Sequence, residues 1–287
     1  MKKYRLRPWI LLFPCLLIMV TTVLYPIFRT FLFSLQNYKM IEPYNRKFVG
    51  INNYLKVLGS QDFHSALKNS LIILVLTLVI AFSFSIVVGL ILNKKSKISP
   101  ILTAVAIIPW ALPPLVNGII WKFVFYPGYG FMNKLLINMG LVENPIEWTS
   151  GITTTLFVVA IVVAWKVIPF CSILILASLQ NIPKELYEAA RVDGCGKIDE
   201  FKKITLPFLL PSFSIVLIQI TIAAINVFDE LVSITGYRLD TATLLIYNYM
   251  NTFTYLDFGY GSAITYIVMI LSGLVGYLYI KNIAKED

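Results

Sequence analysis

Six long apolar runs, separated by polar segments, organise the chain. They lie near residues 8–35, 69–92, 100–125, 153–179, 207–231 and 259–280. Each run could cross a hydrocarbon core of about 30 Å as an α-helix that rises about 1.5 Å per residue. The pattern therefore predicts an all-α integral membrane protein with six transmembrane helices.

Composition also favours a membrane protein over a soluble one. Of the 287 residues, 58% are hydrophobic and 14% are charged, and the mean hydropathy is +0.78. A soluble domain has too little interior to bury so much apolar surface, so most of that surface should face lipid. The first apolar run follows a basic head and is longer than the core of a cleavable signal peptide, so we interpret it as a retained span.

The distribution of positive charge predicts the orientation of the spans. The N-terminal head, the turn at residues 94–97, the loop 181–206 and the C-terminal tail together hold 14 Lys and Arg residues, whereas the other three loops hold seven. Cytoplasmic loops carry the excess of Lys and Arg, so both termini are predicted to be cytoplasmic. The net charge of +9 is explained by this topology, and no nucleic-acid partner is expected.

The loop 181–206 has the pattern of two short helices joined by a glycine turn. Asn181 could cap the first helix, Pro183 suits its first turn, and Gly194 can take the left-handed conformation that ends it. A second helix could follow at residues 197–203. Helical spacing would gather a small apolar knob on one face, formed by Leu186, Ala189 and Ala190. The knob could dock into a partner's groove, or it could lie back on the membrane.

The same loop carries a motif of fixed spacing, Glu188-Ala189-Ala190, then Gly194, then Ile204 and Leu206-Pro207. The motif resembles the EAA loop in the permease subunits of ABC-type importers, and residues 182–194 are similar to the carbohydrate branch of that family. The resemblance extends to the stretches at 49–54 and 257–261. Cys195 is a departure, because many relatives carry alanine there.

The resemblance implies that this loop couples the chain to an ATPase. In the family, the loop's helix docks into a cleft on the ATPase and transmits its closure to the membrane helices. The residues that match are Glu188, Ala189, Ala190, Asp193, Gly194, Ile204, Leu206 and Pro207. The implied fold is that of a type I ABC importer permease, with residues 1–68 as head, first span and outer loop, 69–281 as a core of five helices, and 282–287 as a cytoplasmic tail.

The resemblance also implies an assembly in the bacterial cell membrane. Its other members would be a second, homologous permease subunit, two copies of a cytoplasmic ATPase and an extracytoplasmic solute-binding protein. ATP and Mg would be used by the ATPase, because this chain has no P-loop motif. We expect no catalytic, cofactor or metal site, since His64 is the single histidine and Cys15, Cys171 and Cys195 lie far apart. The chain is therefore not expected to be an enzyme.

The third apolar run carries candidates for a sugar pathway. Trp110, Pro114, Asn117 and Trp121 recur at intervals of four, three and four, which would place them on one face of a continuous helix. Aromatic platforms beside amide groups suit a sugar, which combines flat C–H faces with hydroxyl groups. The alternative is that Trp121 belongs to an outer aromatic belt and that Trp110 packs against another helix.

The fourth and fifth runs carry polar side chains that would be costly in hydrocarbon. Lys166 lies near the middle of the fourth run, and Asp229 or Glu230 could be its partner. A stripe at intervals of seven, seven and four follows the fifth run, formed by Ser212, Gln219, Asn226 and Glu230. The predicted pathway residues are Trp110, Asn117, Trp121, Lys166, Gln219, Asn226 and Glu230. Hydrogen bonds between helices are the alternative explanation of the stripe.

The resemblance, together with these patterns, implies the permease subunit of an ATP-driven importer that moves a sugar or oligosaccharide into the cytoplasm by alternating access. A polyol or a glycerol phosphate-like solute is the alternative cargo. An ATP-independent secondary transporter is the alternative mechanism. That class usually has two symmetric halves with midplane carboxylates, and this sequence shows no evident repeat.

Overall fold

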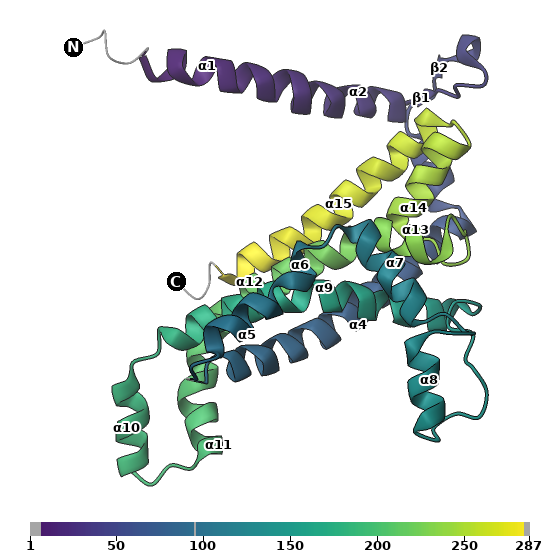
Figure 1. Cartoon of the computed structure of the whole chain (residues 1–287). Coiled ribbons are helices and arrows are strands. Elements are labelled where there is room, and N and C mark those ends of the chain that lie inside the picture. The colour runs from purple at the N-terminus through teal and green to yellow at the C-terminus, as the bar shows by residue number, and fades with distance from the viewer. Residues whose placement is uncertain (1–6, 95, 284–287) are drawn as a thin grey trace. The chain divides into compact units, whose positions relative to one another are not determined.

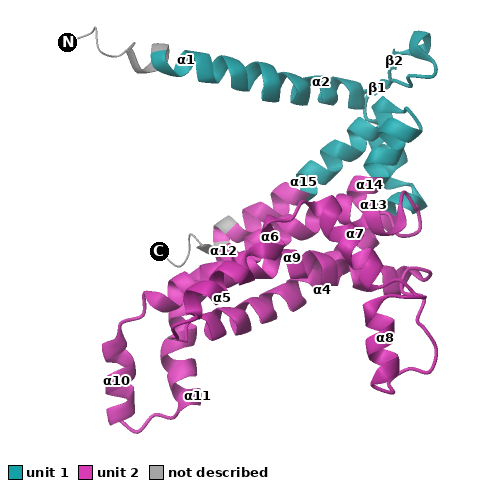
Figure 2. Ribbon diagram, viewed as in Figure 1, with its two compact units in different colours: residues 1–64, 247–271 teal, residues 65–246, 272–287 magenta. Residues whose placement is uncertain are grey.

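The computed structural model describes residues 7–94 and 96–283, and it is built almost entirely of helices (Figure 1). The basic head up to Leu6, Lys95 in the 94–97 turn and the tail from residue 284 lie outside the described residues. The chain divides into two compact units, coloured separately in Figure 2. Unit 1 contains residues 1–64 and 247–271, and unit 2 contains residues 65–246 and 272–287.

Unit 1 holds the first apolar helix and a short hairpin. The helix runs without a break through α1 (Arg7–Met19), the π-helical η1 (Val20–Leu24) and α2 (Tyr25–Ser34). In the hairpin, Gln36 of β1 (Gln36–Asn37) pairs antiparallel with Phe48 of β2 (Lys47–Phe48). The remaining elements of this unit are η2 (Pro43–Asn45), α3 (Asn52–Leu58), the first four residues of α4 (Gln61–Leu92), the end of α14 (Leu244–Tyr249), η4 (Met250–Thr254) and the first part of α15 (Phe258–Ile283).

Unit 2 holds all the residues predicted to form sites. Its elements are α4 (Gln61–Leu92) from residue 65 onward, α5 (Ser99–Ala106), α6 (Ile108–Ala111), α7 (Pro114–Val124), α8 (Phe131–Asn138), α9 (Ile152–Gln180), α10 (Lys184–Val192), α11 (Lys197–Glu200), the π-helical η3 (Phe201–Thr205), α12 (Leu206–Ile225), α13 (Asp229–Thr235) and the start of α14 (Leu244–Tyr249). The end of α15 also belongs to this unit.

Five helices in the described part of the chain are long and apolar enough to cross a membrane. They are Leu11–Ser34, Gln61–Leu92, Ile152–Gln180, Lys197–Ile225 and Phe258–Tyr279. The predicted third span has a different form, because Ser99–Ala111 and Pro114–Val124 meet at an angle of 98°. The prediction of one continuous helix over residues 100–125 is therefore wrong, and the number of spans reaches six when this bent pair counts as one.

Two consecutive prolines explain the bend. A residue that precedes proline is pushed out of the helical region towards extended backbone. Leu112 precedes Pro113, which precedes Pro114, and both Leu112 and Pro113 are extended, with ψ of 138° and 141°. Pro114 then starts α7, where its missing N–H costs nothing.

The predicted fifth span is also interrupted. α12 ends at Ile225, before the predicted end at Leu231, and Phe228 has φ −139° and ψ −67° before α13 begins. The stripe of polar residues therefore does not follow one continuous helix, which corrects that prediction. Ser212, at the start of the stripe, instead shares a hydrogen bond between hydroxyl groups with Ser178 of α9.

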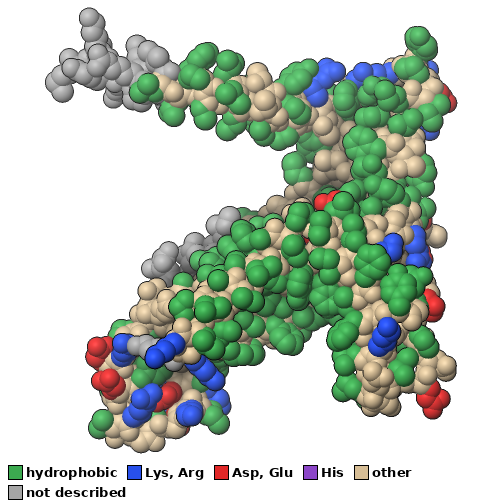
Figure 3. Space-filling model, in the orientation of Figure 1, with side chains coloured by type: hydrophobic (Ala, Val, Ile, Leu, Met, Phe, Trp, Pro, Cys, Tyr) green, Lys and Arg blue, Asp and Glu red, His purple; other side chains and the backbone are tan. Residues whose placement is uncertain are grey.

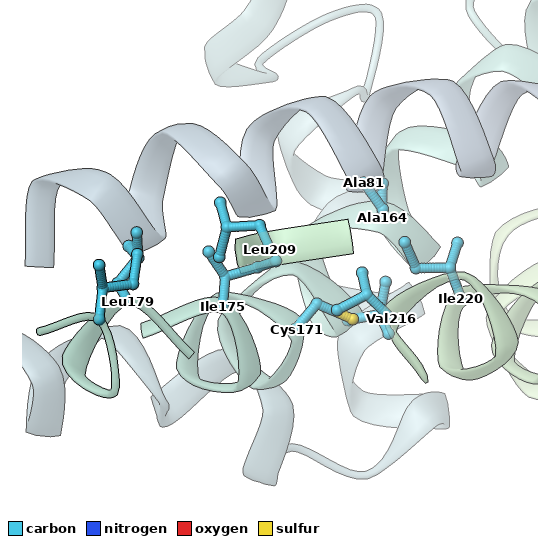
Figure 4. Packing of buried hydrophobic residues seen from close by; sticks show 10 residues of the cluster. Ala81, Ala164, Cys171, Ile175, Leu179, Leu209, Val216 and Ile220 are labelled. Carbon is cyan, nitrogen blue, oxygen red and sulfur yellow. The ribbon is translucent and has the colours of Figure 1, made fainter. Parts of the chain in front are cut away.

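Helix α9 is the central helix of unit 2. In its most apolar stretch 61% of residues are buried, compared with 22% for Gln61–Leu92 and 28% for Lys197–Ile225. Figure 4 shows side chains from α4, α9 and α12 meeting in one core cluster. Its buried members are Ala81, Ala164, Val167, Cys171, Ile175, Leu179, Ile182, Leu209, Val216 and Ile220. The cluster holds α9 and α12 together between the two sites described next.

Candidate functional site

The predicted coupling loop forms a hairpin of α10, α11 and η3 that projects from one end of unit 2 (Figure 1); we call residues 181–206 the coupling hairpin. α10 begins after Pro183, which occupies the cap position, whereas Asn181 ends α9. The prediction that Asn181 caps this helix is therefore wrong. Gly194 ends the helix in the left-handed region, with φ +78°, as its sequence position predicts. Charged side chains gather over this hairpin in Figure 3, beside the mainly hydrophobic α4 and α5.

The two faces of α10 differ in what they contact. Tyr187 and Arg191 lie one turn apart and bond to residues at the start of the following helix, as described below. The opposite face, which we call the outward face, is exposed and consists of Glu185, Glu188, Ala189 and Val192. Leu186 is 38% exposed at its edge, so the predicted apolar knob is open to solvent on one side.

The eight predicted coupling residues do not share one surface. Glu188, Ala189, Asp193 and Gly194 are exposed, and Ala190 is half-buried. Ile204 packs against the core cluster. Leu206 and Pro207 form the first turn of α12. The motif therefore contains two parts, an exposed helix and the support that joins it to the helix core.

A second candidate site is a cavity of about 190 Å³ inside unit 2. Its lining residues are Trp110, Pro114, Val163, Lys166, Val167, Gln219, Ala223, Asn226, Asp229 and Glu230. Five of the seven predicted pathway residues lie here: Trp110, Lys166, Gln219, Asn226 and Glu230. The two helix breaks make this possible, because they bring the end of α6 and the start of α13 beside α9 and α12.

Aromatic, amide and charged groups meet in this cavity. The Trp110 ring stacks on Phe170 of α9, with centroids 5.1 Å apart and planes 15° apart. Lys166 shares the cavity with Asp229 and Glu230, but it forms no ion pair within 4.0 Å among the residues that the structure describes. Glu230 is 6% exposed. The cavity can therefore offer a polar solute a positively charged donor, negatively charged acceptors and neutral amide groups.

Asn117 and Trp121 lie outside the cavity lining. Asn117 is fully buried, and its Nδ2 donates to the carbonyl oxygen of Val162 at 3.2 Å. Trp121 packs between Phe125 and Trp165, with centroid distances of 5.5 and 5.6 Å. The prediction that these two residues share a continuous face with Trp110 is wrong, because the 98° bend separates α7 from α6.

A close helix contact places Glu230 beside the cavity. At Gly118 of α7, a Cβ atom would overlap Ser233 Oγ of α13 and lie 2.8 Å from the carbonyl oxygen of Glu230. Glycine therefore permits α7 and α13 to touch backbone to backbone. This contact fixes α13 against α7 at the turn that carries Glu230.

The cavity also contains residues that sequence reasoning did not select. Val163 lies three residues before Lys166, and Ala223 lies four residues after Gln219, so helical spacing could have identified both. The described part of the chain contains no group of three or more His, Cys, Asp and Glu side chains that could hold a metal ion. The arrangement is suited to holding a polar solute.

The sequence of residues 81–286 matches the family described as "Binding-protein-dependent transport system inner membrane component". This range includes the coupling hairpin and every residue that lines the cavity. Family membership therefore extends over both candidate sites.

Two relatives align with almost the whole chain. The trehalose/maltose transport system permease protein of Thermococcus litoralis is 34% identical over 97% of this chain and 94% of its own length. The sulfoquinovosyl glycerol transport system permease protein of Agrobacterium fabrum is 33% identical over 99% of this chain and 92% of its own length. A chain from the crystal structure of a bacterial ABC transporter that imports the acidic polysaccharide alginate has a TM-score of 0.81 at 19% identity, covering 97% of this chain and 96% of its own. The similarity to this crystal structure shows that the two chains share a fold.

Proposed function

Because the chain belongs to the family of binding-protein-dependent transport system inner membrane components, and to its sugar ABC permeases, we propose that it imports a sugar or oligosaccharide with ATP as the energy source. It would be the membrane-spanning permease subunit of a larger transporter. The relatives named for trehalose/maltose and for sulfoquinovosyl glycerol support a cargo that contains a sugar.

The observation that carries this proposal is the cavity between α6, α9, α12 and α13. Trp110 offers an aromatic surface, and the amides of Gln219 and Asn226 can donate to and accept from hydroxyl groups. Lys166 and Glu230 add one donor and one acceptor of opposite charge. A sugar presents this mixture of apolar faces and hydroxyl groups, so the cavity suits a ring held in several weak contacts.

We further propose that both termini are cytoplasmic and that the bent pair of helices completes six crossings. The coupling hairpin then faces the cytoplasm, in agreement with the excess of Lys and Arg in the loops on its side. The outward face of α10 would dock on an ATPase that binds ATP with Mg. Closure of that ATPase would shift the helices between inward-facing and outward-facing states.

The complete transporter would lie in the bacterial cell membrane and contain four further subunits. These are a second, homologous permease, two copies of the ATPase and an extracytoplasmic solute-binding protein. A solved neighbour of the same fold comes from an alginate ABC transporter in complex with a periplasmic protein, which supports the last of these. The first helix, Leu11–Ser34, has no buried residue in its apolar window, so its surface is available to lipid or to the second permease.

Uptake by whole cells tests the proposal. Labelled trehalose and maltose are supplied to cells with and without this subunit, and to cells whose partner ATPase carries a P-loop Lys→Ala change. We expect accumulation of at least one sugar when both the subunit and the intact ATPase are present. Accumulation that continues with the altered ATPase would indicate a secondary transporter instead.

A polyol phosphate is a second candidate cargo, because Lys166 forms no ion pair among the described residues and shares the cavity with hydrogen-bonding groups. A lysine ammonium group is a common partner of phosphate. Competition distinguishes the two cargoes: unlabelled glycerol phosphate should leave sugar uptake unchanged if the cargo is a neutral sugar.

A further inference from the structure

Two side-chain contacts join α10 to the beginning of the helix that continues as α12. The Tyr187 hydroxyl lies 2.9 Å from Thr205 Oγ1, and Arg191 Nε donates to Glu200 Oε1 at 2.9 Å. Tyr187 and Arg191 are one turn apart, so both contacts leave the same face of α10. We call these four residues the α10 clamp.

The π-helical turn η3 brings the two contacts to one place. Residues five apart share a face in a π-helix, whereas in an α-helix they point well apart. Thr205 therefore lies over Glu200, and its Oγ1 is 3.5 Å from the Glu200 carbonyl oxygen. Glu200 accepts a hydrogen bond from Arg191 through its carboxylate and one from Thr205 through its backbone carbonyl. It therefore contacts both other parts of the clamp.

Burial distinguishes the clamp from an ordinary surface contact. Thr205 is 5% exposed and the Glu200 side chain is 14% exposed, although Arg191 is 68% exposed. Tyr187 also packs against the core cluster. By contrast, the nearby pair Asp199–Lys203 is 3.7 Å long, is exposed on both sides and links one turn of the same segment. Breaking a hydrogen bond to a buried group costs more stability than breaking one between exposed groups.

The turn between α10 and α11 could not transmit movement by itself. It contains Gly194 and Gly196, and a Cβ atom at either position would meet nothing within 4 Å. Glycine restricts the backbone least, and no neighbouring atoms crowd either glycine, although backbone hydrogen bonds join the turn to the end of α10. The clamp bypasses the turn, because it connects α10 directly to η3.

The helix on the other side of the clamp reaches the cavity. The segment Lys197–Ile225 is continuous, and it carries Gln219 in the cavity lining. Thr205 and Gln219 are fourteen residues apart, a separation of about 20 Å along a helix. A continuous path of bonded elements therefore extends from α10 to the cavity.

We propose that Tyr187, Arg191, Glu200 and Thr205 are positioning residues, which make α10 move as one rigid unit with α12. The contacts are observed in the structure, whereas their role in transport rests on the proposed function. Without the clamp, ATPase closure would move α10 and leave α12 behind. ATP would then be hydrolysed with little solute moved.

A spin label at Cys195 tests the rigidity of the hairpin directly. The other cysteines are replaced by Cys15→Ser and Cys171→Ala, and label mobility is measured by electron paramagnetic resonance in the assembled transporter without nucleotide. Tyr187→Phe and Arg191→Gln together should give a clearly more mobile label. Asp199→Asn, which removes the exposed pair, should leave the spectrum unchanged. Equal mobility in the clamp variant and the parent would overturn the proposal.

The ratio of sugar imported to ATP hydrolysed tests the role of the clamp. In reconstituted vesicles the Tyr187→Phe, Arg191→Gln variant should import about threefold less sugar per ATP, while the ATPase remains bound. Arg191→Glu should do the same, and the added change Glu200→Arg should restore much of the ratio, which would identify the ion pair as the cause of the loss. A mobile label with an unchanged ratio would also overturn the proposal. Uptake by the parent protein that needs no ATP would instead refute the proposed function, and the label would still test the clamp.

Discussion

Helix α9 and the continuous helix Lys197–Ile225 have the same length, 29 residues, and both line the cavity. They differ in their surroundings: 61% of the apolar window is buried in α9 and 28% in the other helix. α9 contacts neighbours on most sides and carries Lys166. The other helix carries Gln219 and is joined to the coupling hairpin. Under the proposed function, we therefore expect α9 to be the fixed wall of the cavity and α12 to be the wall that moves.

The free-energy cost of breaking packing contacts also differs between α9 and α12. Displacing a close-packed helix breaks many dispersion contacts at once, whereas an exposed helix can exchange one set of apolar neighbours for another. The exposed face of α12 therefore opposes a shift less than the face that packs against α9 in the core cluster. The following predictions test that contrast.

The largest effect is expected on the outward face of α10, in the coupling hairpin that is joined to α12. Glu188→Lys reverses a charge on the outward face of α10 and should lower uptake about a hundredfold, because a misplaced charge in a docking interface costs several kcal/mol. Asp199→Lys, on α11, is the matched control and should retain uptake. Uptake of the labelled sugar measures both. Normal uptake by Glu188→Lys would mean that this face is not the docking surface.

The next effect concerns stability. Ile175 of α9 is fully buried, and Ile175→Ala should lower the free energy of unfolding by about 2–5 kcal/mol. Ile215 of α12 is 56% exposed, so Ile215→Ala should cost much less. Thermal unfolding in one detergent compares the two variants. Equal losses would contradict the difference in burial between these two side chains.

A smaller effect is expected inside the cavity. Lys166→Met on α9 and Gln219→Leu on α12 should each lower uptake about tenfold, equivalent to about 1.4 kcal/mol, since each removes hydrogen bonds to the solute. ATPase assembly should be retained. Asn117→Leu, a change outside the cavity, should reduce stability without a comparable effect on the affinity for solute. A larger loss of affinity at Asn117 would show that the pathway runs elsewhere.

The smallest effect concerns a contact near the start of α9. Arg238 donates to the Asp240 carboxylate at 3.1 and 2.5 Å and to the carbonyl oxygen of Thr149 at 2.8 Å. The hydrogen bonds from Arg238 lower the pKa of Asp240 below its ordinary value. The stability gained from this pair is therefore complete above the unfolded-state pKa and is lost as the pH falls through the lower, folded-state pKa.

Asp240→Asn should therefore reduce stability at neutral pH by less than about 1 kcal/mol, because both side chains are partly exposed. The difference from the parent should begin to shrink as the pH falls below about 3.9, the ordinary pKa of Asp, and it should disappear only below the lower, folded-state pKa of Asp240. Melting temperatures of both proteins across this range measure the effect. A difference that persists at the acidic end would assign the contribution to another group.

Local signals allowed the coupling hairpin to be predicted in some detail. Gly194 ends α10 in the left-handed conformation, and the segment after residue 197 returns to helix. Both features depend on neighbouring residues alone. The bend at Leu112-Pro113-Pro114 also had a local signal, but apolar residues continue across it, and hydropathy averaged over a span does not register a break.

Other features had no local signal. The mean hydropathy of the most apolar window is 2.5 in α9 and 2.2 in Lys197–Ile225, so hydropathy could not predict which helix is enclosed. The meeting of Trp110 with Glu230 depends on two helix breaks and on the close contact at Gly118. Such contacts arise from tertiary packing, which helical periodicity does not report.

The π-helical turn η3 also has a consequence for chain length. A π turn accommodates one residue more than an α turn, so deleting one residue within 201–204 would leave an α-helical turn with Glu200 and Thr205 still aligned. The same deletion within α12, before Gln219, would rotate every later side chain by about 100° and turn Gln219 away from the cavity. We therefore expect a one-residue deletion at η3 to leave Gln219 in the cavity lining, and the same deletion between the clamp and the cavity to remove it.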